Sequence, residues 1–210
     1  MTIAHPLLSF VLAAGLMTIT PGLDTAIVLR TATTEGAARA VQVAFGVVMG
    51  CLIWGGAVAL GLGALIAQSE VAFTVLKWLG VGYLAWMGLQ LILHPRTGFS
   101  TAATSGSRLD GGRSNWFWKG MAQNLLNPKV GVFYVSFLPQ FVPPDVSVAP
   151  YTFLLAAIHG ALGLAWFAAL LVATRPLVRV LQRPSVIRML DRLTGIVFIG
   201  FGVKLALSRR

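Results

Sequence analysis

Charged side chains are scarce in this chain of 210 residues. Asp, Glu, Lys and Arg make up 10% of the sequence, whereas 57% of the residues are hydrophobic and the mean hydropathy is +0.81. Soluble domains carry about 25% charged residues. A chain with so little charge lacks the side chains needed to cover a surface in water, which excludes an ordinary soluble protein. The composition therefore predicts a protein embedded in a membrane.

Acidic residues are scarcer still. There are 6 Asp and Glu against 16 Lys and Arg, which gives a formal net charge of +10. In a soluble chain, this excess of positive charge would suggest nucleic acid as a partner. Here the basic residues are confined to short segments between apolar runs, which is typical of the signals that orient membrane helices. A nucleic-acid partner is therefore not expected.

The chain has a single cysteine, Cys51, within an apolar run. This excludes a disulfide within the chain and a Cys-x-x-Cys redox pair. The sequence also contains no phosphate-binding loop, no Ser/His/Asp arrangement and no cluster of metal ligands. Neither an enzyme nor a protein with a cofactor or a resident metal is expected.

Long apolar runs dominate the chain. A helix needs about 20 mostly apolar residues to cross a bilayer. Five runs meet this requirement, and a sixth, 193–207, is shorter and is expected to borrow a turn from 188–192. The N-terminus shows no cleavable leader, so the first run is expected to remain as a span. The prediction is an all-α integral membrane protein with six transmembrane helices, the first five at 4–29, 40–67, 71–93, 116–142 and 150–174.

Basic residues follow alternate spans. Arg30 and Arg39 follow the first span, and further basic residues lie around the centre of the chain and between 175 and 192. The positive-inside rule places these segments in the cytoplasm and both termini outside. Lys204 and the two C-terminal arginines count against this orientation, but they are outnumbered.

The chain divides into two similar halves. A segment rich in Gly, Ser and Thr at 94–115 is predicted to be a cytoplasmic linker between a first three-helix repeat, 1–93, and a second, 116–210. The third span of the first half aligns with the last span of the chain, with Gly88 opposite Gly202. Because each half has an odd number of spans, the second half must cross in the opposite direction. The prediction is a 3+3 inverted repeat, which is common among secondary transporters.

The first and fourth spans are both interrupted by proline. In "TITPGLD" Thr20 precedes Pro21, and in "NLLNPKV" Asn127 precedes Pro128. Thr and Asn favour the N-cap of a helix, and proline favours its first position. Each span is therefore predicted to consist of two half-helices, with the N-terminus of the second half inside the membrane. Such an N-terminus attracts an anion, for example a carboxylate.

Two ionisable residues, Asp24 and Lys129, lie next to these interruptions. Charged groups in a membrane are costly and are by default candidates for function. Asp24 could hold a substrate ammonium and Lys129 a carboxylate; alternatively, Asp24 could stabilise a helix N-terminus and Lys129 could reach towards the membrane surface. The predicted set of substrate-binding and coupling residues is Thr20, Pro21, Gly22, Asp24, Asn124, Asn127, Pro128 and Lys129.

Two further features have open interpretations. His159, in the fifth span, is a candidate proton relay, although a lone histidine more often hydrogen-bonds a neighbouring helix. Gly46 and Gly50 form a GxxxG pattern, which either permits close helix packing or supports a homodimer.

Four stretches together resemble the LysE/RhtB family of bacterial amino-acid exporters. They are "TPGLD", "GVVMG", "LGVGYLAWMG" and "NPKVGVFYVSFLPQF", the last being the most specific. The resemblance covers nearly the whole chain, although Leu23 stands where the family usually has a second proline. It implies a multi-pass protein of the bacterial inner membrane that exports amino acids or derivatives such as homoserine, threonine or homoserine lactone, driven by the proton gradient.

These observations lead to one hypothesis with two rivals. The hypothesis is a proton antiporter that binds an amino acid between spans 1 and 4, with Asp24 as the coupling residue. One rival is an exporter of another small solute or a cation, although Lys129 argues against a bare cation. The other is an accessory membrane subunit without transport activity, which would not need two broken helices.

Overall fold

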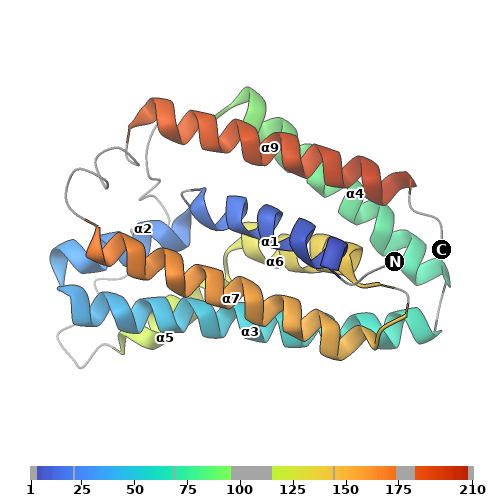
Figure 1. The fold of residues 1–210 in the computed structure, drawn as a ribbon, viewed down its shortest axis with the longest axis horizontal. Helices are drawn as coiled ribbons and strands as arrows, with labels where there is room; N and C mark the ends of the chain where they lie inside the picture. Colours follow the sequence, from blue (N-terminus) through green and yellow to red (C-terminus); the bar gives the residue numbers. More distant parts are fainter. Residues whose placement is uncertain are drawn as a thin grey trace.

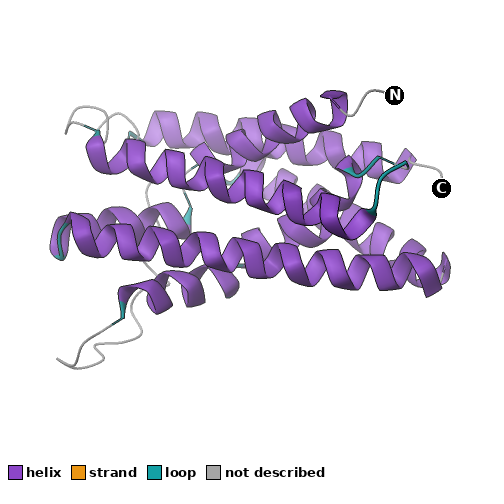
Figure 2. Cartoon of the chain, turned by 60° about the horizontal axis from the view of Figure 1, so that its bottom comes forward, coloured by secondary structure: helices purple, strands orange, loops and turns teal. Residues whose placement is uncertain are grey.

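The computed structural model of the chain describes residues 4–20, 22–68, 70–95, 115–143, 145–173 and 183–207. Within these residues, the regular structure is entirely helical, and short loops connect the helices (Figure 2). The predicted all-α class is therefore confirmed. Most of the predicted linker lies outside the described residues. The elements are α1 (Ala4–Ile19), α2 (Leu23–Thr34), α3 (Ala37–Gln68), α4 (Glu70–Leu93), α5 (Trp116–Leu125), α6 (Pro128–Val132), η2 (Phe133–Phe137), η3 (Leu138–Phe141), α7 (Val148–Val172) and α9 (Pro184–Leu207).

Several helices have the length and apolar composition that a membrane span needs. Ala37–Gly61 in α3 and Val148–Val172 in α7 have mean hydropathies of 2.2 and 2.0. His5–Ile19 and Leu23–Thr34 qualify together as one broken span, bent by 49°. The helices α4 and α9 contain 24 residues each. The described part of the chain thus has helices able to cross a membrane, and the count of six spans stays a prediction.

The start of the last helix differs from the prediction. We expected a span at 193–207 extended by one turn, but α9 begins at Pro184. Its first half is amphipathic: one face buries an apolar and polar set with helical spacing, and the other face exposes the arginines. Hydropathy averaged over both faces hides such a helix. The buried set is Ile187, Leu190, Asp191 and Thr194, and the exposed arginines are Arg188 and Arg192.

The helix α3 packs against α5 and α7 (Figure 1). A Cβ added to Gly46 of α3 would collide with the backbone of Phe117, and one added to Gly120 of α5 would collide with the backbone of Val43. Gly50, one turn along α3, faces Asn124. The GxxxG pattern therefore serves packing within the chain and gives no support for a homodimer.

The helices α4 and α9 run antiparallel and lie side by side (Figure 1). A Cβ on Gly88 would lie 2.7 Å from the carbonyl oxygen of Gly195 and 3.3 Å from the nitrogen of Ile199. A Cβ on Gly202 would lie 3.7 Å from the carbonyl oxygen of Val81 and 3.8 Å from the nitrogen of Ala85. The alignment that pairs Gly88 with Gly202 also pairs Val81 with Gly195 and Ala85 with Ile199. The two sets of contacts therefore exchange under this alignment, as they do in any closely packed antiparallel pair of helices.

The helices α3 and α7 show the same kind of exchange. A Cβ on Gly55 of α3 would collide with Ala156 of α7, and a Cβ on Gly163 of α7 would lie 4.0 Å from Val48 of α3. If Gly55 is equivalent to Gly163, then Val48 is equivalent to Ala156, and each contact maps onto the other. Both helix pairs are therefore closely packed and antiparallel.

Stacked aromatic rings hold the fourth span in place. Phe133 and Phe137 of η2 stack with ring centroids 4.7 Å apart, and Phe137 also meets Phe201 of α9 at 4.3 Å. Phe141 of η3 contacts Phe10 of α1 at 5.4 Å. These rings, which are worth about 0.5–1.5 kcal/mol per pair beyond their burial, anchor the helix that follows the break at Asn127.

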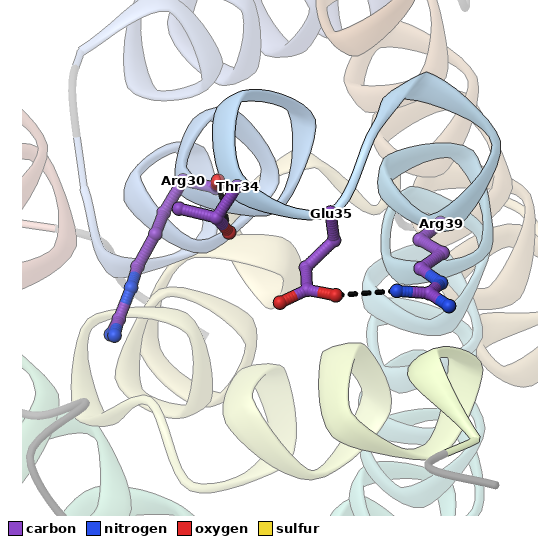
Figure 3. Close-up of polar contacts among 4 residues, drawn as sticks. All are labelled: Arg30, Thr34, Glu35 and Arg39. Carbon is purple, nitrogen blue, oxygen red and sulfur yellow. Dashed lines mark hydrogen bonds and ion pairs between the residues drawn. The ribbon is translucent and has the colours of Figure 1, made fainter.

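Basic side chains gather at one end of the bundle. The turn between α2 and α3, the start of α5 and the start of α9 lie at the same end, opposite both chain termini (Figure 1). In the turn, Gly36 has a φ of 94°, and Glu35 pairs with Arg39 at 2.5 Å (Figure 3). Arg39 and Lys119 both lie over the ring of Trp116, at 5.9 and 4.1 Å. This grouping is the one that the positive-inside rule needs.

Candidate functional site

The break in the first span has a different geometry from the one predicted. The N-cap of α2 is Gly22, without a side-chain hydrogen bond, and the helix begins at Leu23. The hydroxyl of Thr20 donates to the carbonyl of Leu16 at 2.7 Å, one turn back in α1. The prediction that Thr20 caps the second half-helix is therefore wrong, because its hydroxyl completes the turn before it. Pro21 lies outside the described residues.

Thr20 has a second contact that the sequence did not indicate. Its oxygen lies 2.5 Å from the hydroxyl oxygen of Thr194 in α9, and both residues are buried. This hydrogen bond joins the break in the first span to the last helix. A threonine in an otherwise apolar helix is only a weak signal, so sequence reasoning missed Thr194.

The break in the fourth span has the predicted geometry. Asn127 is the N-cap of α6, Pro128 is its first residue, and the side chain of Asn127 accepts a hydrogen bond from the backbone N–H of Lys129 at 3.1 Å. The predicted cap is confirmed. A π-helical segment, η2, follows at once. Such segments often occur at functional sites.

The two breaks meet at Asp24, in the first turn of α2. Asn124 donates to Oδ2 of Asp24 at 2.9 Å, and Asn127 donates to Oδ1 at 3.3 Å. Both asparagines are buried, with 0% and 4% of their surface exposed. Each oxygen of the carboxylate thus has an amide donor. The structure brings Asp24, Asn124 and Asn127 together, as the prediction of a single site requires.

Lys129 approaches the same site from α6. Its Nζ would lie 3.7 Å from a Cβ added to Gly22, so the ammonium is next to the N-terminus of α2. Lys129 also lines one cavity together with Asp24 and His159. The positive charge therefore lies among the predicted residues, and not at the membrane surface.

A cavity of about 60 Å³ lies between these groups. It is lined by both breaks and by helices α3 and α7. A volume of about 10–15 Å³ holds one water, whereas ligand pockets measure about 300–1,000 Å³. The cavity has room for a few waters, and its walls must separate before an amino acid can enter. Its polar lining residues are Thr18, Thr20, Asp24, Thr25, Cys51, Asn127, Lys129 and His159.

His159 reaches the cavity from α7. Its Nδ1 lies 2.9 Å from the hydroxyl of Tyr134 in η2, and both residues are buried. The hydrogen bond to a neighbouring helix that we considered for His159 is thus present. Tyr134 was not predicted, although it follows Asn127 by two helical turns and so shares its face of the helix.

The chain is similar to several known membrane and efflux proteins. A family model described as "LysE type translocator" matches residues 15–209. The threonine efflux protein of Salmonella typhi is 32% identical, over 91% of this chain and 92% of that protein. The leucine efflux protein of Klebsiella pneumoniae is 28% identical, over 95% and 93%. The Bacillus subtilis membrane protein YrhP is 29% identical, over 97% and 100%.

No solved structure matches the chain. The family consists of transporters, which are not enzymes, and two of the relatives carry the name of an amino-acid efflux protein. The family model covers nearly the whole chain, including both breaks and every residue that lines the cavity. On this ground, the resemblance noted in the sequence is confirmed: the chain belongs to the LysE type translocator family.

Proposed function

We propose that this protein exports amino acids with an uncharged side chain, such as threonine, homoserine or leucine, or close derivatives such as homoserine lactone. The observation that carries the proposal is that a carboxylate and an ammonium line the same cavity. Asp24 and Lys129 both line it. A free amino acid is a zwitterion, so it offers each of these groups a partner of opposite charge.

In the proposed complex, the substrate ammonium binds Asp24 and its carboxylate binds Lys129 and the N-terminus of α2. Asn124 and Asn127 fix the Asp24 carboxylate by donating to both of its oxygens. The N-cap residue Gly22 provides no side-chain hydrogen bond, so no cap side chain satisfies the first N–H groups of α2. Backbone N–H groups at a helix N-terminus favour an anion.

The architecture that we propose is a 3+3 inverted repeat with six spans, divided at 94–115. The two interrupted spans support it, because each half contributes one of them. The end of the bundle that carries Arg39 and Lys119 would face the cytoplasm of a bacterial inner membrane.

Transport requires that the site open to each side in turn. The cavity has a volume of about 60 Å³, which is too small for an amino acid. We propose that one half rocks against the other around the site, as inverted repeats allow. A proton would bind Asp24 when the substrate ammonium leaves, and its release to the cytoplasm would complete proton antiport. Whether His159 relays this proton stays a prediction.

Two rival functions predict different residues in this cavity. In a cation exporter, Asp24 would attract the substrate but the ammonium of Lys129 in the same cavity would repel it. The presence of Lys129 therefore favours a zwitterionic substrate. A non-transporting accessory subunit would have no use for a carboxylate held between two broken helices.

The test is uptake of labelled threonine and leucine into inverted membrane vesicles, in which export becomes accumulation. When the vesicle interior is more acidic than the medium, we expect the labelled amino acids to accumulate above their level in vesicles without the protein. This accumulation should disappear when the pH gradient is collapsed. The same vesicles are then given potassium and sodium ions. Cation movement with no movement of any amino acid would favour the first rival, and no movement of any solute would favour the second.

A further inference from the structure

A chain of hydrogen bonds runs from Asn124 to His159 behind the cavity. The NH₂ group of Asn124 has two hydrogens. One goes to Oδ2 of Asp24 at 2.9 Å, and the other goes to Sγ of Cys51 at 3.5 Å. The Cys51 thiol also lies close enough to the Tyr134 hydroxyl for the two groups to interact. Tyr134 in turn contacts Nδ1 of His159 at 2.9 Å.

The direction of this chain follows from its first member. The group of Asn124 that faces Asp24 and Cys51 is its amide NH₂, which can only donate hydrogen bonds. The sulfur of Cys51 therefore accepts from Asn124, and its own S–H is left to donate to Tyr134. The Tyr134 hydroxyl can then donate to Nδ1 of His159. If Tyr134 instead donated to Cys51, then Asn124 and Tyr134 would both donate to the sulfur. The S–H group of Cys51 would then have neither of them as an acceptor.

A neutral imidazole that accepts at one nitrogen carries its proton on the other. With Nδ1 of His159 occupied by Tyr134, Nε2 is the nitrogen left for the cavity that His159 lines. His159 therefore presents an N–H group to the cavity that Asp24 and Lys129 also line. The cavity would thus offer a second donor for the negative end of a zwitterion.

We propose that Tyr134 is a positioning residue that fixes His159 as the Nε2–H tautomer, and that this N–H donates a hydrogen bond to the carboxylate of the bound amino acid. The binding role rests on the proposed function; the tautomer does not. Sequence alone gives no sign of the pair, because Tyr134 and His159 lie in different spans and Cys51 in a third.

The first experiment reads the tautomer without any substrate. The chain has 3 histidines, so a variant with His5→Gln and His94→Gln retains His159 alone. In ¹⁵N-histidine-labelled full-length protein in nanodiscs, two-bond ¹H–¹⁵N correlation spectra identify the protonated nitrogen. We expect the Nε2–H form, and a mixture of tautomers after Tyr134→Phe. A proton on Nδ1 of His159 in the variant that retains Tyr134 would overturn the proposed tautomer. So would an unchanged spectrum after Tyr134→Phe.

The second experiment measures competition by threonine and by threonine amide, which lacks the carboxylate charge. A hydrogen bond to a charged group corresponds to about 10- to 150-fold in affinity. His159→Leu should weaken threonine binding within this range and leave the amide within about twofold, whereas His159→Gln, which keeps an N–H donor, should retain most of the affinity. Tyr134→Phe should weaken threonine binding only in proportion to the Nε2–H tautomer that is lost, and should also leave the amide within about twofold. The double variant should be no weaker than His159→Leu alone. Tyr151→Phe is the matched control, since the buried Tyr151 hydroxyl on α7 has no hydrogen-bond partner among the described residues.

Equal losses for threonine and its amide, or additive losses in the double variant, would overturn the binding role of His159. If the wild-type protein binds no amino acid at all, the proposed function fails and the binding role fails with it, but the spectra would still decide the tautomer. If amino-acid transport is established and His159→Leu has wild-type affinity for threonine, only the present inference fails.

Discussion

The side-chain amide of Asn124 donates to Oδ2 of Asp24 over 2.9 Å, although the two residues are 100 positions apart in the chain. Each residue lies beside an interruption of its own span. Their contact therefore couples the two breaks, and any movement of one half relative to the other must change the surroundings of the Asp24 carboxylate. This coupling gives the transporter a way to link the binding of a cation or a proton to the opening of the cavity.

The contact depends on close packing at Gly50. A Cβ at this position would lie 2.6 Å from Oδ1 and 2.9 Å from Cβ of Asn124. We expect Gly50→Ala to push Asn124 away from Asp24, to lower the free energy of unfolding by about 1–3 kcal/mol as overpacking does, and to reduce transport. The measurement is thermal unfolding in detergent together with transport in vesicles.

Gly56→Ala on the same helix is the matched control, since a Cβ there has nothing within 4 Å. It should be neutral, or stabilise α3 by up to about 1 kcal/mol through helix propensity. Equal effects of the two substitutions would show that the space at Asn124 is not critical.

Lys129 is expected to set the preference for a free carboxylate. Lys129→Met keeps the length of the side chain but removes the ammonium. Export of free threonine should weaken by about 10- to 150-fold, whereas export of its amide or of homoserine lactone, which lack the anion, should change much less. Competition among these compounds in vesicles gives the comparison. A uniform loss would instead assign Lys129 to the fold or to neutralising Asp24.

The α4–α9 contact should be sensitive at Gly88. A Cβ there would lie 2.7 Å from the carbonyl oxygen of Gly195 and 2.7 Å from Cγ1 of Ile199. Gly88→Ala should therefore lower the unfolding temperature, at a cost of about 1–3 kcal/mol. Gly82→Ala, on the same helix with nothing within 4 Å, is the control. If Gly88→Ala is as stable as Gly82→Ala, the close approach of α4 and α9 is wrong.

Orientation can be tested with single cysteines. Cys51 is buried and is first replaced by alanine. Ala38→Cys, at the exposed start of α3 beside Arg39, should resist an impermeant thiol reagent in whole cells, and Ser147→Cys, exposed before α7, should react. Both should react once the cells are opened. The reverse pattern in whole cells would invert the proposed topology.

Local chemistry made part of this site predictable. Asn127 before Pro128 predicted the cap that the structure contains, because capping involves only neighbouring residues. The same logic failed at Thr20, whose hydroxyl had an alternative acceptor one turn back, in the carbonyl of Leu16. A short pattern indicates which bonds are available to a side chain, but not which of them the fold selects.

Other features depend on packing between distant segments. The contacts of Asn124 with Asp24 and of Tyr134 with His159 join different spans, so no local pattern contains them. The cost of a charge in a membrane predicted that Asp24 and Lys129 matter, but not that two asparagines hold the carboxylate. The start of α9 was hidden because its buried and exposed faces average to a low hydropathy.

The most direct test of the account is threonine accumulation in proteoliposomes that contain the purified protein, with and without a pH gradient, for the wild type and Asp24→Asn. Asp24→Asn retains the size of the side chain but cannot titrate, and its one amide oxygen can still accept from either Asn124 or Asn127. We predict that the wild-type protein accumulates threonine only with the gradient, and that Asp24→Asn, folded and inserted at the same level, accumulates no more than empty liposomes. Gradient-driven accumulation by Asp24→Asn at the wild-type rate would contradict the proposed coupling at Asp24.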